Sequence, residues 1–121
     1  MTTNELNLPM ALARAAANKK AIDIKILDLR GKSDLCDYQI ICSGKSDRQT
    51  QAIANEIDKV CKKNLGIKPL HVEGMQAGQW ILLDLGSTMV HIFQSEVRGY
   101  YAIEGLWPEA ERIPLSLERK P

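Results

Sequence analysis

The chain has 121 residues, the size of one domain, and enough to bury one sizeable hydrophobic core. Its 16 basic and 15 acidic residues give a net charge of +1, which excludes a global electrostatic attraction to nucleic acid or anionic lipid. No segment approaches the roughly 20 apolar residues that span a bilayer, and the N-terminus lacks the pattern of a signal peptide. The three cysteines form no Cys-x-x-Cys pair, which fits a reducing compartment, so we expect a cytoplasmic protein without membrane partners.

The first third of the chain predicts a helix followed by two paired strands. Residues 5–20 hold an alanine-rich run that favours a helix, with Pro9 placed where a first helical turn tolerates proline. Alternating apolar residues over 23–29 and a buried apolar run over 38–43 predict two strands. The turn at 30–33 leaves a connection short enough for these strands to pair antiparallel.

A capping box marks the start of a second helix. Ser46 and Gln49 have the S-x-x-Q spacing in which the serine caps the helix and the glutamine lies at its third position. Apolar residues then recur on one helical face, and Gly66 suits the C-terminal end. Four lysines cluster near that end: Lys59, Lys62, Lys63 and Lys68. We interpret this cluster as a solvated helix end, with an RNA-binding patch as the alternative.

The second half of the chain predicts a short strand, a hairpin and a last helix. The short strand covers 69–73, and the strand–helix–strand passage over 38–72 is long enough for a right-handed parallel crossover. After the hairpin, Ser95 caps a helix that reaches Tyr101 and is broken or kinked near Gly105.

The tail that follows has no clear secondary-structure pattern. Residues 109–121 combine charges, two prolines and little periodicity, so we expect an irregular end. No internal repeat or low-complexity segment interrupts the chain. A single domain therefore covers 1–121, with 111–121 as a loosely docked tail.

The hairpin over 79–93 organises the rest of the chain. Gly86 and Ser87 form a two-residue loop of the kind that favours a type II′ turn. This turn fixes the strand register, because each residue before it then faces one residue after it. The opposed pairs are Leu85 with Thr88, Asp84 with Met89, Leu82 with His91, and Trp80 with Phe93.

Side-chain alternation gives this hairpin two different faces. The core face is almost entirely aliphatic and carries Ile81, Leu83, Leu85, Thr88, Val90 and Ile92. The second face mixes large apolar groups with an acid and an imidazole: Trp80, Leu82, Asp84, Met89, His91 and Phe93. Two interpretations stay open for it. A helix of this chain covers it, with Asp84 and His91 paired beneath, or a partner docks there.

Tests for an active site fail along the chain. The GKS triplets at 31–33 and 44–46 lack the phosphate-loop glycine, because Ile26 and Gln39 stand in its place. Nucleotidyl transfer needs two carboxylates alternating on one strand to hold metal ions, and Asp84 is alone. His91 has no serine or cysteine placed as its nucleophile. The histidines and cysteines also lack metal-site spacing, so we predict no catalytic residue, no metal and no cofactor.

Six short motifs occur in order along the chain. They are DY at 37–38, SGKSDRQ at 43–49, VEG at 72–74, WILLDLG at 80–86, VHIF at 90–93 and YAIEGLW at 101–107. Each is weak alone, but their order and spacing are specific. Together they resemble the ribosomal silencing factor family, also called Iojap-like, over about residues 8–110.

The resemblance implies a fold and a function without catalysis. Family members have an α/β fold similar to nucleotidyltransferases but without the catalytic carboxylates. We therefore expect one domain with a mixed five-stranded sheet and flanking helices. The implied function is translational repression: the factor docks on ribosomal protein fourteen of the large subunit, at the intersubunit face. The docked factor then blocks joining of the small subunit when nutrients are scarce.

The resemblance also implies which residues touch the partner. The contact residues of the family correspond to Trp80, Leu85 and Tyr101, while Leu106 and Trp107 belong to the same closing motif. The sequence departs from the family pattern at 87–88, at Gly99 and at Gly105, and these departures lower the stability expected of the last helix. A minor contact with ribosomal RNA and a homodimer of the free protein are further expectations. The alternatives are a nucleotidyltransferase-like enzyme with a degenerate site and an RNA-binding ribosome assembly factor.

Overall fold

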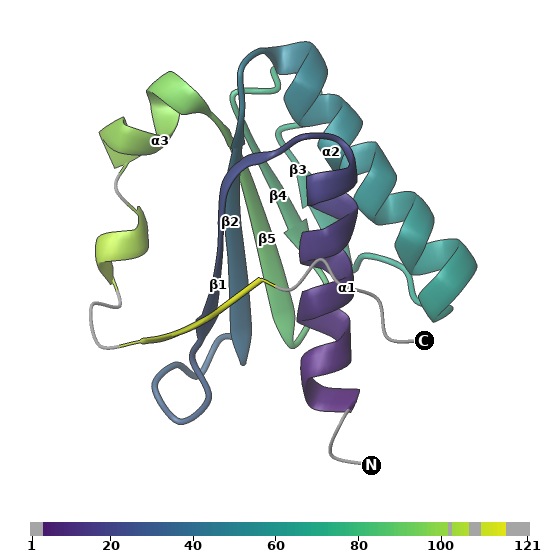
Figure 1. Ribbon diagram of the computed structural model, residues 1–121, viewed down its shortest axis with the longest axis vertical. Coiled ribbons are helices and arrows are strands. Elements are labelled where there is room, and N and C mark those ends of the chain that lie inside the picture. Colours follow the sequence, from purple (N-terminus) through teal and green to yellow (C-terminus); the bar gives the residue numbers. More distant parts are fainter. Residues whose placement is uncertain (1–3, 102, 107–109, 116–121) are drawn as a thin grey trace.

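A six-stranded mixed sheet forms the centre of the molecule, with helices on both faces (Figure 1). The computed structural model describes residues 4–101, 103–106 and 110–115. The helices are α1 (Asn4–Asn18), α2 (Asp47–Val60) and α3 (Ser95–Tyr101), with a π-helical turn at Cys61–Leu65 and a 3-10 turn at Ile103–Leu106. The strands are β1 (Ile22–Asp28), β2 (Tyr38–Gly44), β3 (His71–Glu73), β4 (Trp80–Asp84), β5 (Thr88–Gln94) and β6 (Glu111–Ile113). The sheet order is β3-β4-β5-β2-β1-β6, which confirms the predicted α/β class.

The central hairpin has the predicted register. Strands β4 and β5 pair antiparallel, with Trp80 opposite Phe93, Leu82 opposite His91 and Asp84 opposite Met89. The turn is closed by a hydrogen bond of 2.9 Å from the backbone N–H of Leu85 to the carbonyl of Thr88. Gly86 has φ +89°, a conformation that glycine adopts without strain.

The strand that pairs parallel with β2 is β5, and β3 lies at the far edge of the sheet. The connection from β2 through α2 therefore passes over β5 and β4 before the chain re-enters the sheet as β3. Burial explains this order: every residue of β5 is buried or half-buried, whereas all three residues of β3 are exposed. A strand that is apolar on both sides takes the centre of a sheet, and a short exposed strand takes its edge.

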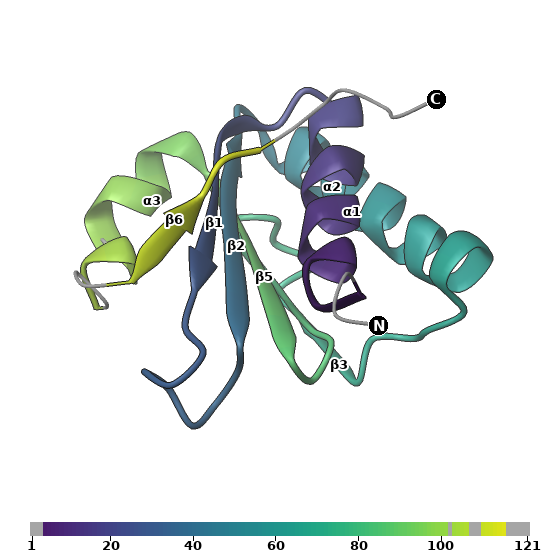
Figure 2. The ribbon, with the colours of Figure 1, turned by 60° about the horizontal axis from the view of Figure 1, so that its bottom comes forward.

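A sixth strand corrects the five predicted from the sequence. Residues 111–113 of the expected irregular tail form β6, which pairs antiparallel with β1 (Figure 2). Arg112 lies opposite Leu27 in this pairing. The strand is too short to show alternation, and its pairing comes from the free edge of β1 rather than from its own sequence. The tail is thus docked at 111–113.

Both ends of α2 follow the sequence signals. The side chain of Ser46 accepts a hydrogen bond of 3.1 Å from the backbone N–H of Gln49. The Gln49 side chain returns to the loop, accepting from the backbone N–H of Lys45 at 2.7 Å. At the other end, the π-helical turn stops at Gly66, whose φ is +66°. The Ser46 cap and the glycine end are therefore confirmed, whereas the Gln49 side chain bonds the residue before the cap instead of the cap residue itself.

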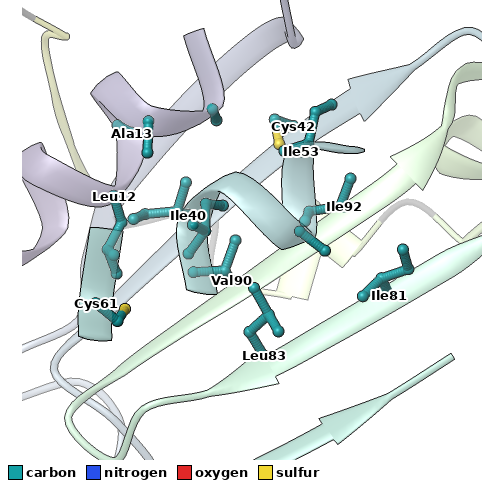
Figure 3. Close-up of a cluster of buried hydrophobic side chains, with 14 of the residues drawn as sticks. Leu12, Ala13, Ile40, Cys42, Ile53, Cys61, Ile81, Leu83, Val90 and Ile92 are labelled. Carbon is teal, nitrogen blue, oxygen red and sulfur yellow. The ribbon is translucent and has the colours of Figure 1, made fainter. Parts of the chain in front are cut away.

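The main core lies between the sheet and the pair α1 and α2 (Figure 3). Each element contributes fully buried side chains: Leu12 and Ala13 from α1, Ile53 from α2, Ile40 and Cys42 from β2, Ile81 and Leu83 from β4, and Val90 and Ile92 from β5. The aliphatic face of the hairpin is therefore a core face, as predicted, and it packs against the α1 and α2 side. This leaves the second hairpin face on the side of α3.

Candidate docking surface

The second hairpin face is only partly covered. We call it the open face and define it by Trp80, Leu82, Asp84, Met89, His91 and Phe93. A small second core covers its β2 side, where Phe93 packs with Leu27, Leu29, Cys36 and Ile41. Val97 of α3 packs against the same cluster. Trp80, Leu82, Asp84 and Met89 are half-buried, so this chain covers the face only in part, and the docking of a partner on the rest stays a prediction.

Three rings stack on this face. The rings of Trp80 and Phe93 are stacked, with their centroids 4.9 Å apart. The His91 ring is nearly parallel to Phe93, with an interplanar angle of 11° and a centroid distance of 6.2 Å. Phe93 is fully buried and His91 is only 5% exposed, so they form the floor under the half-buried indole. Such stacked pairs hold an aromatic side chain in one orientation.

A hydrogen bond fixes the indole further. Trp80 Nε1–H donates to Nδ1 of His91 at 3.1 Å. Because Nδ1 accepts, the neutral imidazole carries its proton on Nε2. Nε2 is buried and has no hydrogen-bond partner among the residues that the structure describes. Burial lowers the pKa of His91 to about 4, so the ring is neutral near pH 7.

The predicted pairing of Asp84 with His91 is wrong. The Asp84 carboxylate instead accepts a hydrogen bond of 2.9 Å from the backbone N–H of Gly86. His91 lies opposite Leu82, so Asp84 and Trp80 are its two diagonal neighbours on β4. The long indole spans this diagonal, whereas the short aspartate side chain bonds the backbone of its own turn, as aspartates commonly do.

The burial of His91 predicts a loss of stability in mild acid. Between a pKa of 6.5 in the unfolded chain and about 4 in the folded protein, the unfolded chain binds a proton that the folded protein excludes. Stability therefore falls as the pH drops through this window, by at most about 1.4 kcal/mol per pH unit. Urea unfolding at about pH 7 and about pH 5 measures the slope. His91→Asn keeps an acceptor near Nδ1 and does not titrate, so it should lack most of this slope. Equal slopes in both proteins would contradict the prediction.

Helix α3 is anchored to the sheet by a buried arginine. Arg98 is 7% exposed, and its Nη1 donates to the Ser43 hydroxyl at 2.9 Å and to the Asp23 carbonyl at 2.8 Å. The Ser95 hydroxyl adds a bond of 3.3 Å to the Gly44 carbonyl. Sequence reasoning missed Arg98, because an arginine in a short helix has no signal that distinguishes an anchor from a solvated charge. This anchor sets the position of the helix that ends at Tyr101.

The structure separates the predicted contact residues. Trp80 is half-buried on the open face, whereas Leu85 packs against the main core on the other side of the hairpin. Leu106 is 65% exposed in the 3-10 turn after α3. Only the backbone of Tyr101 is described, as the last residue of α3, and Trp107 lies outside the described residues. The contact role of all five stays a prediction.

Metal-binding clusters and reactive thiols are the two kinds of site to consider in the part of the chain that the structure describes. The described residues contain no group of three or more His, Cys, Asp or Glu side chains that could hold a metal ion. Burial raises the pKa of Cys42 to about 12 and that of Cys61 to about 11, so both thiols stay protonated. Among the described helices, none has the length and apolar character of a membrane span.

Comparisons with known proteins agree on one family. The family model described as "Ribosomal silencing factor during starvation" matches residues 2–121. The chain is 42% identical to ribosomal silencing factor RsfS of Bacillus subtilis over 107 residues, covering 88% of this chain and 90% of that protein. A crystal structure from Bacillus halodurans is similar with a TM-score of 0.80 and 37% identity, covering 91% of this chain and 99% of the other. A more distant relative is the Mus musculus protein "Mitochondrial assembly of ribosomal large subunit protein 1", 30% identical over 74% of this chain and 40% of its own length.

These matches extend over the sheet, the hairpin and both long helices. The family model covers all six motifs found in the sequence. The match to the Bacillus subtilis factor covers most of both chains, so it concerns a whole domain rather than a shared fragment. This chain therefore belongs to the ribosomal silencing factor family.

Proposed function

We propose that this protein is a translational repressor that docks on the large ribosomal subunit and sterically prevents the small subunit from joining. Its partner in this proposal is ribosomal protein fourteen at the intersubunit face. Family membership supports the association with ribosomes. The observation that carries docking is the half-buried Trp80, held by Phe93 and His91 on a sheet face that the helices leave partly uncovered. A rigid aromatic anchor of this kind is typical of protein interfaces.

Several features favour binding over catalysis. Asp84, the one acid on the hairpin strands, is engaged with the turn backbone. Ser46 of the GKS triplet caps α2. We propose that the protein acts without catalysis, in the cytoplasm, and that a free molecule can pair with a second copy through the open face. Docking on the ribosome would then compete with self-association, and sedimentation of the free protein over a concentration series tests this.

Co-sedimentation with purified subunits tests the proposal directly. We expect the protein to pellet with the large subunit and not with the small subunit. Equal binding to both subunits, or binding to neither, would contradict it. Incorporation of a labelled nucleotide in the presence of Mg²⁺ would instead support a degenerate nucleotidyltransferase.

Docking on a protein predicts a shallow salt dependence. The net charge is +1, and a protein contact releases few of the counterions that make phosphate binding salt-sensitive. We expect affinity for the large subunit to fall little when salt is raised. Titrations at several salt concentrations measure the slope, and a steep slope would favour direct contact with ribosomal RNA.

The second candidate is an RNA-binding ribosome assembly factor. One observation favours it: Lys59, Lys63 and Lys68 are exposed near the C-terminal end of α2, beside Lys62. Lys62 forms an ion pair of 3.0 Å with Asp58, which reduces the charge of the patch. The name of the mouse relative also refers to assembly of the large subunit. Salt-sensitive binding to naked RNA, abolished by replacing these lysines with glutamine, would support this candidate.

A further inference from the structure

A small cavity lies beside Trp80 on the open face. It has a volume of about 250 Å³ and is lined by Glu73, Gly74, Trp80 and Leu82. Glu73 and Leu82 are opposed residues of β3 and β4, so the cavity sits at the edge of the sheet, next to the ring stack. The indole of Trp80 therefore forms one wall of this cavity.

The indole wall of this cavity presents no free hydrogen-bond donor. The only polar atom of the indole is Nε1, and its N–H points to Nδ1 of His91 at 3.1 Å. Phe93 stacks against the same ring and keeps it in this orientation. An occupant of the cavity therefore meets the carbon surface of the indole together with the aliphatic side chain of Leu82.

Gly74 provides a wall of bare backbone. Its φ is +84°, and a Cβ at this position would collide with the carbonyl oxygen of Trp80. The loop after β3 therefore packs directly against the backbone of β4, a close approach that only glycine permits at this position. A site shaped in this way suits a compact apolar group.

The charge at the rim disfavours a nucleic acid as the occupant. Glu73 is exposed and is the only ionisable residue among the four that line the cavity. Its carboxylate contacts the imidazole of His71, which is also exposed. A carboxylate repels a phosphate backbone but attracts a basic side chain, so the rim favours a protein surface.

We propose that the docking partner inserts an apolar side chain, flanked by a basic residue, into the cavity beside Trp80, and makes no hydrogen bond to the indole nitrogen. This inference rests on the proposed function and specifies the chemistry of the partner surface. Trp80 then acts through shape and apolar contact, and His91 is the positioning residue that turns its polar atom inward. Buried apolar anchors of this kind carry most of the affinity in protein interfaces.

Two substitutions test the contact, with binding to purified large subunits as the measurement. Trp80→Phe keeps an aromatic wall without an N–H, and we expect it to weaken binding less than about 5-fold, against about 30-fold or more for Trp80→Ala. Leu82→Phe fills the cavity, and we expect a loss of about 10-fold or more. Val72→Phe is the matched control, because Val72 lies on the neighbouring strand, is 43% exposed and faces the other side of the sheet. Thermal unfolding checks that each variant is folded.

The rim is tested by Glu73→Gln, with Glu111→Gln on the opposite sheet edge as its control. We expect only the first change to weaken binding, by about 3-fold or more at low salt. Equal losses for Trp80→Phe and Trp80→Ala would overturn the apolar contact, and wild-type binding by Leu82→Phe would overturn the occupied cavity. If Trp80→Ala binds normally, the open face is not the docking surface and this inference fails with it. If the wild-type protein does not bind large subunits, the proposed function itself fails.

Discussion

Trp80→Ala should weaken binding to the large ribosomal subunit by about 30-fold or more, since truncating an aromatic anchor commonly costs about 2 kcal/mol or more. The indole is half-buried, so its removal takes contact area from the partner while most of the core stays intact. Phe93 and His91 remain as the floor of the site, but the projecting ring is lost. Equilibrium binding to purified subunits measures the effect.

The control for this variant is Val72→Ala. Val72 is also a partly exposed apolar residue near the same sheet edge, but it faces the α2 side. We expect it to bind as the wild type does, and both variants to unfold near the wild-type temperature. An unchanged affinity for Trp80→Ala would remove the open face from the docking surface.

Phe93→Ala should destabilise the protein by about 3–5 kcal/mol, the usual cost of emptying a fully buried phenylalanine site. Phe93 is 0% exposed and lies in the second core with Leu27 and Ile41. It also supports the indole of Trp80 from below. Because single domains have stabilities of only about 5–15 kcal/mol, we expect a much lower urea midpoint together with weaker docking.

Phe93→Leu separates these two effects. Leucine keeps much of the buried volume but offers no ring to stack on Trp80. We expect this variant to recover most of the stability lost in Phe93→Ala while docking stays weakened. A urea midpoint for Phe93→Ala within error of the wild type would contradict the assigned second core.

Local sequence signals were sufficient where one short-range interaction decides the structure. The Gly86-Ser87 turn fixed the hairpin register because a one-residue slip would move every apolar side chain to the wrong face. The Ser46 capping box located the start of α2 in the same way, through bonds within four residues. These parts of the fold could be predicted because their partners are close in the chain.

Long-range pairing was harder to predict. Strand β6 forms only because the edge of β1 is free to pair, and nothing in residues 111–113 signals that edge. The partner of His91 depended on the reach of two diagonal side chains, and the indole reached it where the aspartate did not. The role of Arg98 required knowing that α3 packs over Ser43, far away in the sequence.

The site was predictable in part for the same reason. The register places Trp80 opposite Phe93, so the aromatic face could be predicted from the sequence alone. The degree to which α3 covers that face was not, because it depends on packing between Val97 and the second core. Leu85, which the resemblance placed with Trp80, packs on the opposite side by strand alternation. Its contribution to docking would have to come from the turn end of the hairpin.

We propose that the docked protein keeps the ribosomal subunits apart. The most direct measurement is the formation of complete ribosomes from purified large and small subunits, followed by sucrose-gradient sedimentation with saturating protein. We expect that complete ribosomes are lost, that the protein migrates with free large subunits, and that Trp80→Ala restores joining. Unimpeded assembly of complete ribosomes with the wild-type protein bound would contradict it.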